Sequence, residues 1–272
     1  MLDSTFTVVI AHFGDVYWVR KAIEEASLGS LDEIEAIFII DQNGADATLN
    51  KWTADLKKVE VIEFPSQGTG NANHANAINQ FIKSIVINTS HLVLMDSDLI
   101  IQNHNWIYHI KQILSKTDGC LALDPTSDYL THPCFMAIPK SALAQINFME
   151  GMKNLRVDTG RTIGIQLDGL GYSLTLLKPS PAYGGAMGFT YLNSAFYHVT
   201  SISIRQQPSR RVNKSKLRID LAESWRRWVV FSKLQKKNTL INKLLFYSLR
   251  IAYSILFILK SLTSEIRIRK DT

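Results

Sequence analysis

Cysteine is scarce in this chain, with only Cys120 and Cys134 among 272 residues. Their spacing matches no zinc-binding or redox pattern, and so few cysteines are typical of a reducing, cytosolic setting. Packing in a hydrophobic interior is the expected role of both side chains.

Long apolar stretches are also missing. Residues 1–7 contain no basic segment ahead of an apolar one, so we expect no secretory signal. The longest charge-free run near the other end, 251–259, has nine residues, whereas a membrane-spanning helix needs about 20. There is no internal repeat and no low-complexity linker. With 46% hydrophobic residues, the chain can form one large globular domain, with or without an appendage.

Acidic residues are rare in the last quarter of the chain. Residues 200–272 carry 17 Lys and Arg against 4 Asp and Glu, a net charge of +13. The other 13 basic and 20 acidic residues give the first 199 positions a net charge of −7. An acidic body with a basic tail indicates a tail that meets an anionic surface.

Short β-branched runs alternate with helical patterns in the first hundred residues. Strands are expected at 6–11, 36–40, 59–64 and 92–95, and helices between them at 16–27, 47–56 and 71–86. This alternation predicts an α/β fold, a Rossmann-like, mainly parallel sheet with helices on both faces. Ligands of such sheets bind beyond the carboxyl ends of the strands.

The second half is less regular. It predicts helices at 105–115, 141–148 and 159–170, and short strands at 120–124, 134–138, 172–177 and 196–200.

The most informative segment is 91–101, where an apolar run is interrupted by Asp96 and Asp98 and then continues. Charges inside such a run are costly unless they are compensated. Two carboxylates one residue apart can point the same way from an extended segment and hold a hard divalent cation. The alternative is an Asp-Ser-Asp turn between two strands.

Five segments follow one another along the chain: Val-Val-Ile-Ala-His-Phe-Gly at 8–14, Ile-Ile-Asp-Gln-Asn-Gly-Ala-Asp at 39–46, Gly-Thr-Gly-Asn-Ala-Asn-His-Ala-Asn at 68–76, Asp-Ser-Asp at 96–98, and Val-Asp at 157–158. In this order they resemble motifs of the family-two glycosyltransferases, which have the GT-A fold and use nucleotide-diphospho-sugars. The first turn lacks the family's Pro and Asn, Asn76 stands in place of Gly, and Val157 in place of Glu. The resemblance covers 5–205, which we predict to be the catalytic domain.

The resemblance implies a role for each matched residue in donor binding. Asp41 would accept a hydrogen bond from a uracil-type base, and backbone groups near Ala11 and His12 would hold the same base. Asn73, with nearby backbone amides, would approach ribose and phosphate, and Asp96 would contact the ribose. For Asp41 the residues alone leave the alternative of a turn cap.

The resemblance also implies a metal site and a general base. Asp98 and His198 would ligate Mn²⁺ or Mg²⁺, and Asp158 would take the proton from the acceptor hydroxyl in an inverting displacement. The alternatives are a packed His198 and a helix cap at Asp158. Asp124 and Asp128 are alternative bases.

Residues 206–272 are predicted to form a basic helical extension. Lys243, Tyr247, Arg250, Ser254 and Ser261 recur at helical spacing as a narrow polar stripe, typical of a helix in a membrane interface. Packing on the body or on a second copy is the alternative. No RNA-binding motif accompanies the basic residues, so we expect no nucleic-acid partner.

The sequence therefore predicts an inverting, metal-dependent glycosyltransferase in polysaccharide biosynthesis. Its donor would be a nucleotide sugar, with UDP-sugar favoured, and its acceptor a glycan or lipid-linked glycan hydroxyl. The expected location is cytoplasmic, peripheral on the cytoplasmic face of the membrane. The alternatives are an inactive nucleotide-sugar-binding or scaffold protein and a nucleotidyltransferase, although the latter's basic Gly-rich signature does not follow the first strand. An NAD-linked enzyme is disfavoured because no Gly-x-Gly-x-x-Gly is present there.

Overall fold

The structure is a computed structural model of the chain, and it describes residues 5–13, 16–27, 32–42, 47–64, 71–149, 159–181 and 189–198. Three predictions fall outside these residues: Asp158 as the base, the glycine-rich segment 68–70, and the basic extension 206–272 with its boundary at 205. They stay predictions.

A seven-stranded sheet with the strand order β3-β2-β1-β4-β7-β6-β8 forms the centre of the described region. Only β7 runs against the others, because it pairs antiparallel with both β4 and β6. The mainly parallel sheet expected from the sequence is therefore confirmed. Its strands are β1 (Phe6–His12), β2 (Ile34–Asp41), β3 (Val59–Glu63), β4 (His91–Asp96), β6 (Gly119–Leu123), β7 (Thr131–Pro139) and β8 (Leu174–Leu177).

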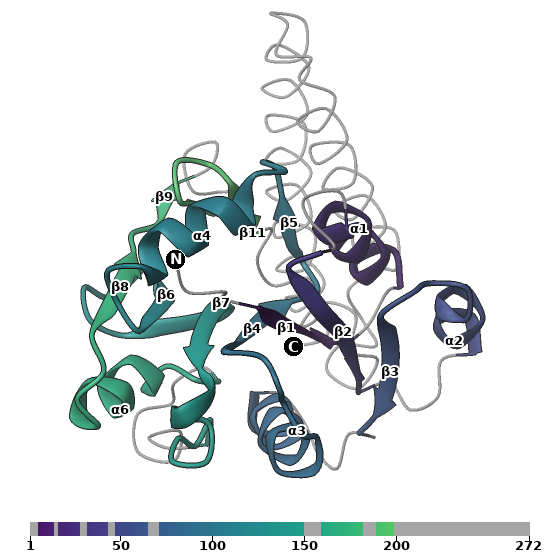
Figure 1. Cartoon of the computed structure of the whole chain (residues 1–272), viewed down its shortest axis with the longest axis horizontal. Coiled ribbons are helices and arrows are strands. Elements are labelled where there is room, and N and C mark those ends of the chain that lie inside the picture. Colours follow the sequence, from purple (N-terminus) through teal and green to yellow (C-terminus); the bar gives the residue numbers. More distant parts are fainter. Residues whose placement is uncertain are drawn as a thin grey trace, which may run out of the picture. The chain divides into compact units, whose positions relative to one another are not determined.

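Helices cover both faces of this sheet, as Figure 1 shows. Side chains alternate along a strand, so Val8 and Val9 of β1 point to opposite faces. Val8 belongs to the hydrophobic cluster that holds α1 and α4, and Val9 to the cluster that holds α3 and α6. The helices are α1 (Val16–Ser27), α2 (Ala47–Thr53), α3 (Asn71–Ser84), α4 (Trp106–Leu114) and α6 (Ile163–Gly169).

A smaller antiparallel sheet has the order β5-β11-β10-β9. Its strands are β5 (Leu99–Ile101), β9 (Ser180–Pro181), β10 (Phe189–Tyr191) and β11 (Phe196–His198). Leu99, Ile101, Tyr191 and Phe196 join the cluster that also holds α1 and α4, so this sheet shares one core with that face of the central sheet.

The prediction of a helix over 141–148 is wrong. A short 3₁₀ turn, η1 (Lys140–Ala142), stands there instead, followed by turns. The backbone N–H groups that would continue a helix have side-chain partners: Asn147 donates to Gln166 Oε1 at 2.8 Å and Phe148 donates to Asn79 Oδ1 at 3.1 Å. Side-chain acceptors on α3 and α6 therefore replace the helical carbonyls.

Among the described residues, no helix combines the length and apolar character that crossing a membrane would require.

Candidate functional site

Strand register brings the predicted donor-binding residues to one edge of the central sheet. In β1, Ala11 lies opposite Asp96 of β4, and His12 lies opposite Asp41 of β2. The three strands are parallel, so their carboxyl ends meet where ligands of such sheets bind. The Ala11 carbonyl accepts a hydrogen bond from the Ser97 N–H at 3.1 Å, which ties the turn after β4 to β1.

Asp96, Asp98 and His198 form a compact cluster at this edge. Asp96 ends β4 and Asp98 lies in the two-residue turn before β5, so the turn and the paired carboxylates occur together. β11 pairs with β5 so that His198 faces Leu99, the residue after Asp98. As a result His198 Nε2 lies 3.2 Å from Asp98 Oδ1 and 3.7 Å from Asp96 Oδ2.

The three residues can offer their ligand atoms to one ion. One atom from each, a carboxylate oxygen or an imidazole nitrogen, lies within 4.8 Å of the others. Asp98 and His198 are 8% and 4% exposed, so the cluster is shielded from bulk water. Two carboxylates and an imidazole form a donor set that suits Mn²⁺ or Mg²⁺.

The first turn of α3 approaches the same carboxylates. His74 Nε2 lies 3.7 Å from Asp96 Oδ1, and Asn73, the preceding residue, is half-buried. A helix N-terminus carries a partial positive charge and unpaired N–H groups, which favour anions. Asn73 therefore lies on the helix that approaches Asp96, and its contact with ribose and phosphate stays a prediction. The sequence interpretation assigned no role to His74.

Two further residues missed by sequence reasoning lie beside His198. His132 and Cys134 are at the start of β7, which reaches the same edge because it runs antiparallel to β4. The backbone N–H of Cys134 donates to His132 Nδ1 at 3.1 Å, and the rings of His132 and His198 have centroids 4.8 Å apart. The available signal was the spacing of two, which puts both side chains on one face of a strand.

The electrostatics of the cluster set the charge of each group. Burial alone would raise the pKa of Asp98, but attraction to His198, a hydrogen bond from that imidazole and attraction to His132 lower it below its usual value. Burial lowers the pKa of His132 to about 3. Burial also raises the pKa of the Cys134 thiol well above its ordinary value. At neutral pH the cluster therefore contains an ionised Asp98, a neutral His132 and a protonated Cys134.

Asp124, an alternative base in the sequence interpretation, has its oxygens engaged by neighbours. It follows β6, and its Oδ1 accepts hydrogen bonds from the N–H of Thr126 at 2.7 Å and from the hydroxyl of the same residue at 2.5 Å. Arg161 Nε lies 3.3 Å from its Oδ2. These contacts fix the loop after β6.

Comparison of the sequence with models of known protein families gives no match, and comparison with curated proteins gives none either. Solved structures do match. The mannosyltransferase PcManGT from Pyrobaculum calidifontis superimposes with a TM-score of 0.50 at 12% identity, covering 82% of this chain and 64% of that one. TarS 1–349 of S. aureus superimposes with a TM-score of 0.48 at 12% identity, covering 74% of this chain and 62% of that one. The galactosyltransferase LgtC superimposes with a TM-score of 0.47 at 13% identity, covering 62% of this chain and 72% of that one.

The chain has the GT-A fold. It spans less than two thirds of the length of the mannosyltransferase, 64%, and of TarS, 62%.

Proposed function

We propose that this protein is an inverting, metal-dependent glycosyltransferase. It transfers a sugar from a nucleotide-diphosphate donor, UDP-sugar being favoured, to a hydroxyl of a glycan or lipid-linked glycan in polysaccharide biosynthesis. The observation that carries the proposal is the meeting of Asp96, Asp98 and His198 at the carboxyl edge of a GT-A sheet.

The donor set supports a divalent cation at these residues. Asp98 and His198 would hold it, with Asp96 beside them, and Mn²⁺ or Mg²⁺ fits the mixture of oxygen and nitrogen ligands. When bound, the cation would act as a Lewis acid that neutralises charge on the departing diphosphate. The mannosyltransferase with this fold was solved in complex with GDP-Man and Mn²⁺, which supports a nucleotide-sugar donor and a divalent cation here.

The remaining residues would position donor and acceptor. Asp41 would accept an N–H of the base, beside the backbone of Ala11 and His12, and Asn73 would contact ribose and phosphate. Asp158 would remove the proton from the acceptor hydroxyl as its oxygen attacks the anomeric carbon and the bond to the diphosphate breaks. Attack opposite to the leaving group inverts the configuration.

The excess of basic residues after position 200 favours a cytoplasmic protein attached peripherally to the cytoplasmic face of a membrane. A lipid-linked acceptor would be presented at that surface.

Thermal unfolding with nucleotides tests donor and metal binding together. UDP, GDP and their sugar conjugates are each added with and without Mn²⁺, and a ligand at a hundred times its Kd stabilises the native state by about 2.7 kcal/mol. We expect a rise in Tm that is larger with metal. Asp98→Asn should lose the increment due to metal, whereas Asp168→Asn, an exposed carboxylate on α6, should keep it.

Equal shifts with and without Mn²⁺ for both UDP and GDP, in the parent and in Asp98→Asn alike, would contradict the proposal. Turnover separates the alternatives. An inactive nucleotide-sugar-binding protein would show the Tm shift without release of nucleoside diphosphate. A nucleotidyltransferase would consume a nucleoside triphosphate and release pyrophosphate.

A further inference from the structure

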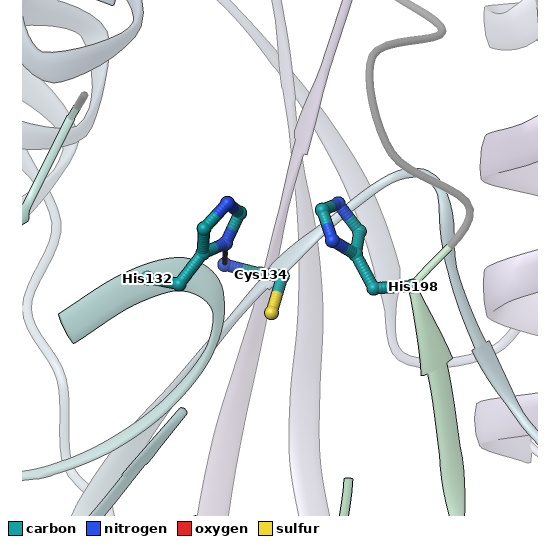
Figure 2. A group of neighbouring side chains, drawn as sticks. All are labelled: His132, Cys134 and His198. Carbon is teal, nitrogen blue, oxygen red and sulfur yellow. Dashed lines mark hydrogen bonds between the residues drawn. The ribbon is translucent and has the colours of Figure 1, made fainter. Parts of the chain in front are cut away.

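A second group of potential ligands lies against the carboxylate cluster. His132, Cys134 and His198 can each offer one ligand atom, a ring nitrogen or the sulfur, such that the three atoms lie within 4.8 Å of one another. Figure 2 shows the two imidazole rings facing each other across Cys134. The roles given above to Asp98 and His198 use neither His132 nor Cys134.

We propose that His132, Cys134 and His198 form a second cation position that takes Zn²⁺ or another thiophilic divalent ion and shares His198 with the carboxylate position. The inference goes beyond the proposed glycosyl transfer, and its test requires no transfer activity.

Two separate features of the fold, one on β7 and one on β11, place these side chains together. On β7, the spacing of two puts His132 and Cys134 on one face, and the pairing of Met95 with Phe135 puts Cys134 next in register to Asp96. On β11, the pairing of His198 with Leu99 brings the third ligand from a segment more than sixty residues later in the chain. Cys134 is fully buried and His198 is 4% exposed, so the three ligands are held by packed strands.

The donor chemistry differs from that of the carboxylate position. Thiolate with imidazole selects Zn²⁺ and other thiophilic ions, whereas carboxylates select Mg²⁺ and Mn²⁺. Zinc sites with three protein ligands keep a fourth position for water or another ligand.

Binding requires three local changes that balance chemically. The Cys134 thiol gives its proton to solvent as the metal–sulfur bond forms. His132 exchanges the hydrogen bond from the Cys134 N–H at its Nδ1 for the metal. Zn–N bonds of about 2.0–2.1 Å and Zn–S bonds of about 2.3 Å require the ligand atoms to approach to about 3.3–3.7 Å, a small contraction.

Sharing His198 has a consequence for metal selection. His198 Nε2 lies 3.2 Å from Asp98 Oδ1 and 3.7 Å from Asp96 Oδ2, so ions at the two positions would share one imidazole ring and repel each other at short range. Thiophilic and hard cations therefore compete, although only one ligand is common to both positions.

Cobalt reports directly on the sulfur ligand. The full-length protein, without a histidine tag and stripped of metal by a chelator, is titrated with Co²⁺ while the thiolate-to-cobalt charge-transfer absorption in the near ultraviolet is recorded. We expect this band in the parent, its loss in Cys134→Ser and its retention in Cys120→Ser. Cys120 is the matched control, because it is buried and unpaired on the neighbouring strand β6 and lies outside the cluster.

Two more variants separate the positions. Asp98→Asn should keep the band, because it removes a carboxylate and leaves the sulfur. His132→Gln should weaken Zn²⁺ binding by about tenfold or more in calorimetry, and it decides the question if Cys134→Ser fails to fold by circular dichroism.

A parent protein without the band overturns the proposal, as does a band that survives in folded Cys134→Ser or is lost from folded Cys120→Ser. Unchanged Zn²⁺ affinity in His132→Gln overturns it equally.

Discussion

At the scale of single residues, the pKa of His132 makes the stability of the native state depend on pH. It is a half-buried imidazole beside His198, and burial lowers its pKa to about 3. The unfolded chain protonates a histidine near pH 6.5. Between these two values the unfolded state binds more protons than the native state, so the native state loses stability as the pH falls from 6.5. The pKa of His91, also lowered by burial, acts in the same direction.

We therefore expect the free energy of unfolding to decrease between pH 7 and pH 5, by at most about 1.4 kcal/mol per pH unit for each such histidine. Urea unfolding at several pH values in the presence of a chelator measures it. His132→Gln should reduce the slope and leave the part due to His91. His104→Gln, which changes an exposed side chain, should keep the parent slope. Identical slopes in the His132→Gln variant and the parent would show that the pKa of His132 is not lowered in the native state.

At the scale of elements, the connection into α6 depends on one backbone position. Gly160 has φ of +66°, and a Cβ there would lie 2.9 Å from Phe148 Cδ1. Its carbonyl accepts a hydrogen bond from the Thr131 hydroxyl at 2.9 Å, which joins this turn to β7. At the other end of α6, a Cβ on Gly169 would meet nothing within 4 Å.

Gly160→Ala should therefore destabilise the protein by about 1–3 kcal/mol, because it adds both a strained φ and a steric clash. Gly169→Ala should be neutral or stabilising by up to about 1 kcal/mol, because alanine restricts the unfolded chain and favours the helix. Chemical denaturation of both variants measures the difference. A Gly160→Ala protein as stable as Gly169→Ala would mean that the turn relaxes without cost.

Elements with a clear periodicity of apolar residues were the easiest to predict. The helix expected at 16–27 is α1 with the same bounds, and each predicted strand of the first hundred residues overlaps an observed one. The helix expected at 159–170 begins only at Ile163, and that at 141–148 is absent, because Asn79 and Gln166 take the backbone N–H groups of Phe148 and Asn147. Because these partners are distant in the sequence, the local pattern of apolar residues cannot predict them.

At the scale of the whole molecule, charge is the dominant asymmetry. The first 199 residues carry −7 and the rest +13. Anionic lipid attracts basic residues by about 1 kcal/mol each near the surface, and salt screens this attraction over about 8 Å at physiological ionic strength. The basic extension 206–272 is therefore the segment that we expect to contact a membrane.

We expect the full chain to sediment with vesicles that contain anionic lipid, and to be released at 0.5 M salt or from neutral vesicles. Replacing the five basic residues of 210–218 with Gln should lower the bound fraction by about tenfold or more. The control replaces five exposed lysines of the first 199 residues, Lys51, Lys57, Lys83, Lys116 and Lys140. Equal loss of binding in the two variants would indicate a response to net charge alone.

The sequence by itself determined the alternating elements, the carboxylates at the end of β4 and the division of charge, because all of these are encoded by local spacing or by composition. Only the tertiary structure decided which distant residues meet. His198 reaches Asp98 through the pairing of β11 with β5, and His132 and Cys134 reach the same edge because β7 lies antiparallel beside β4. Strand order and direction depend on how hydrophobic faces are buried over the whole domain, and no short stretch of sequence carries that information.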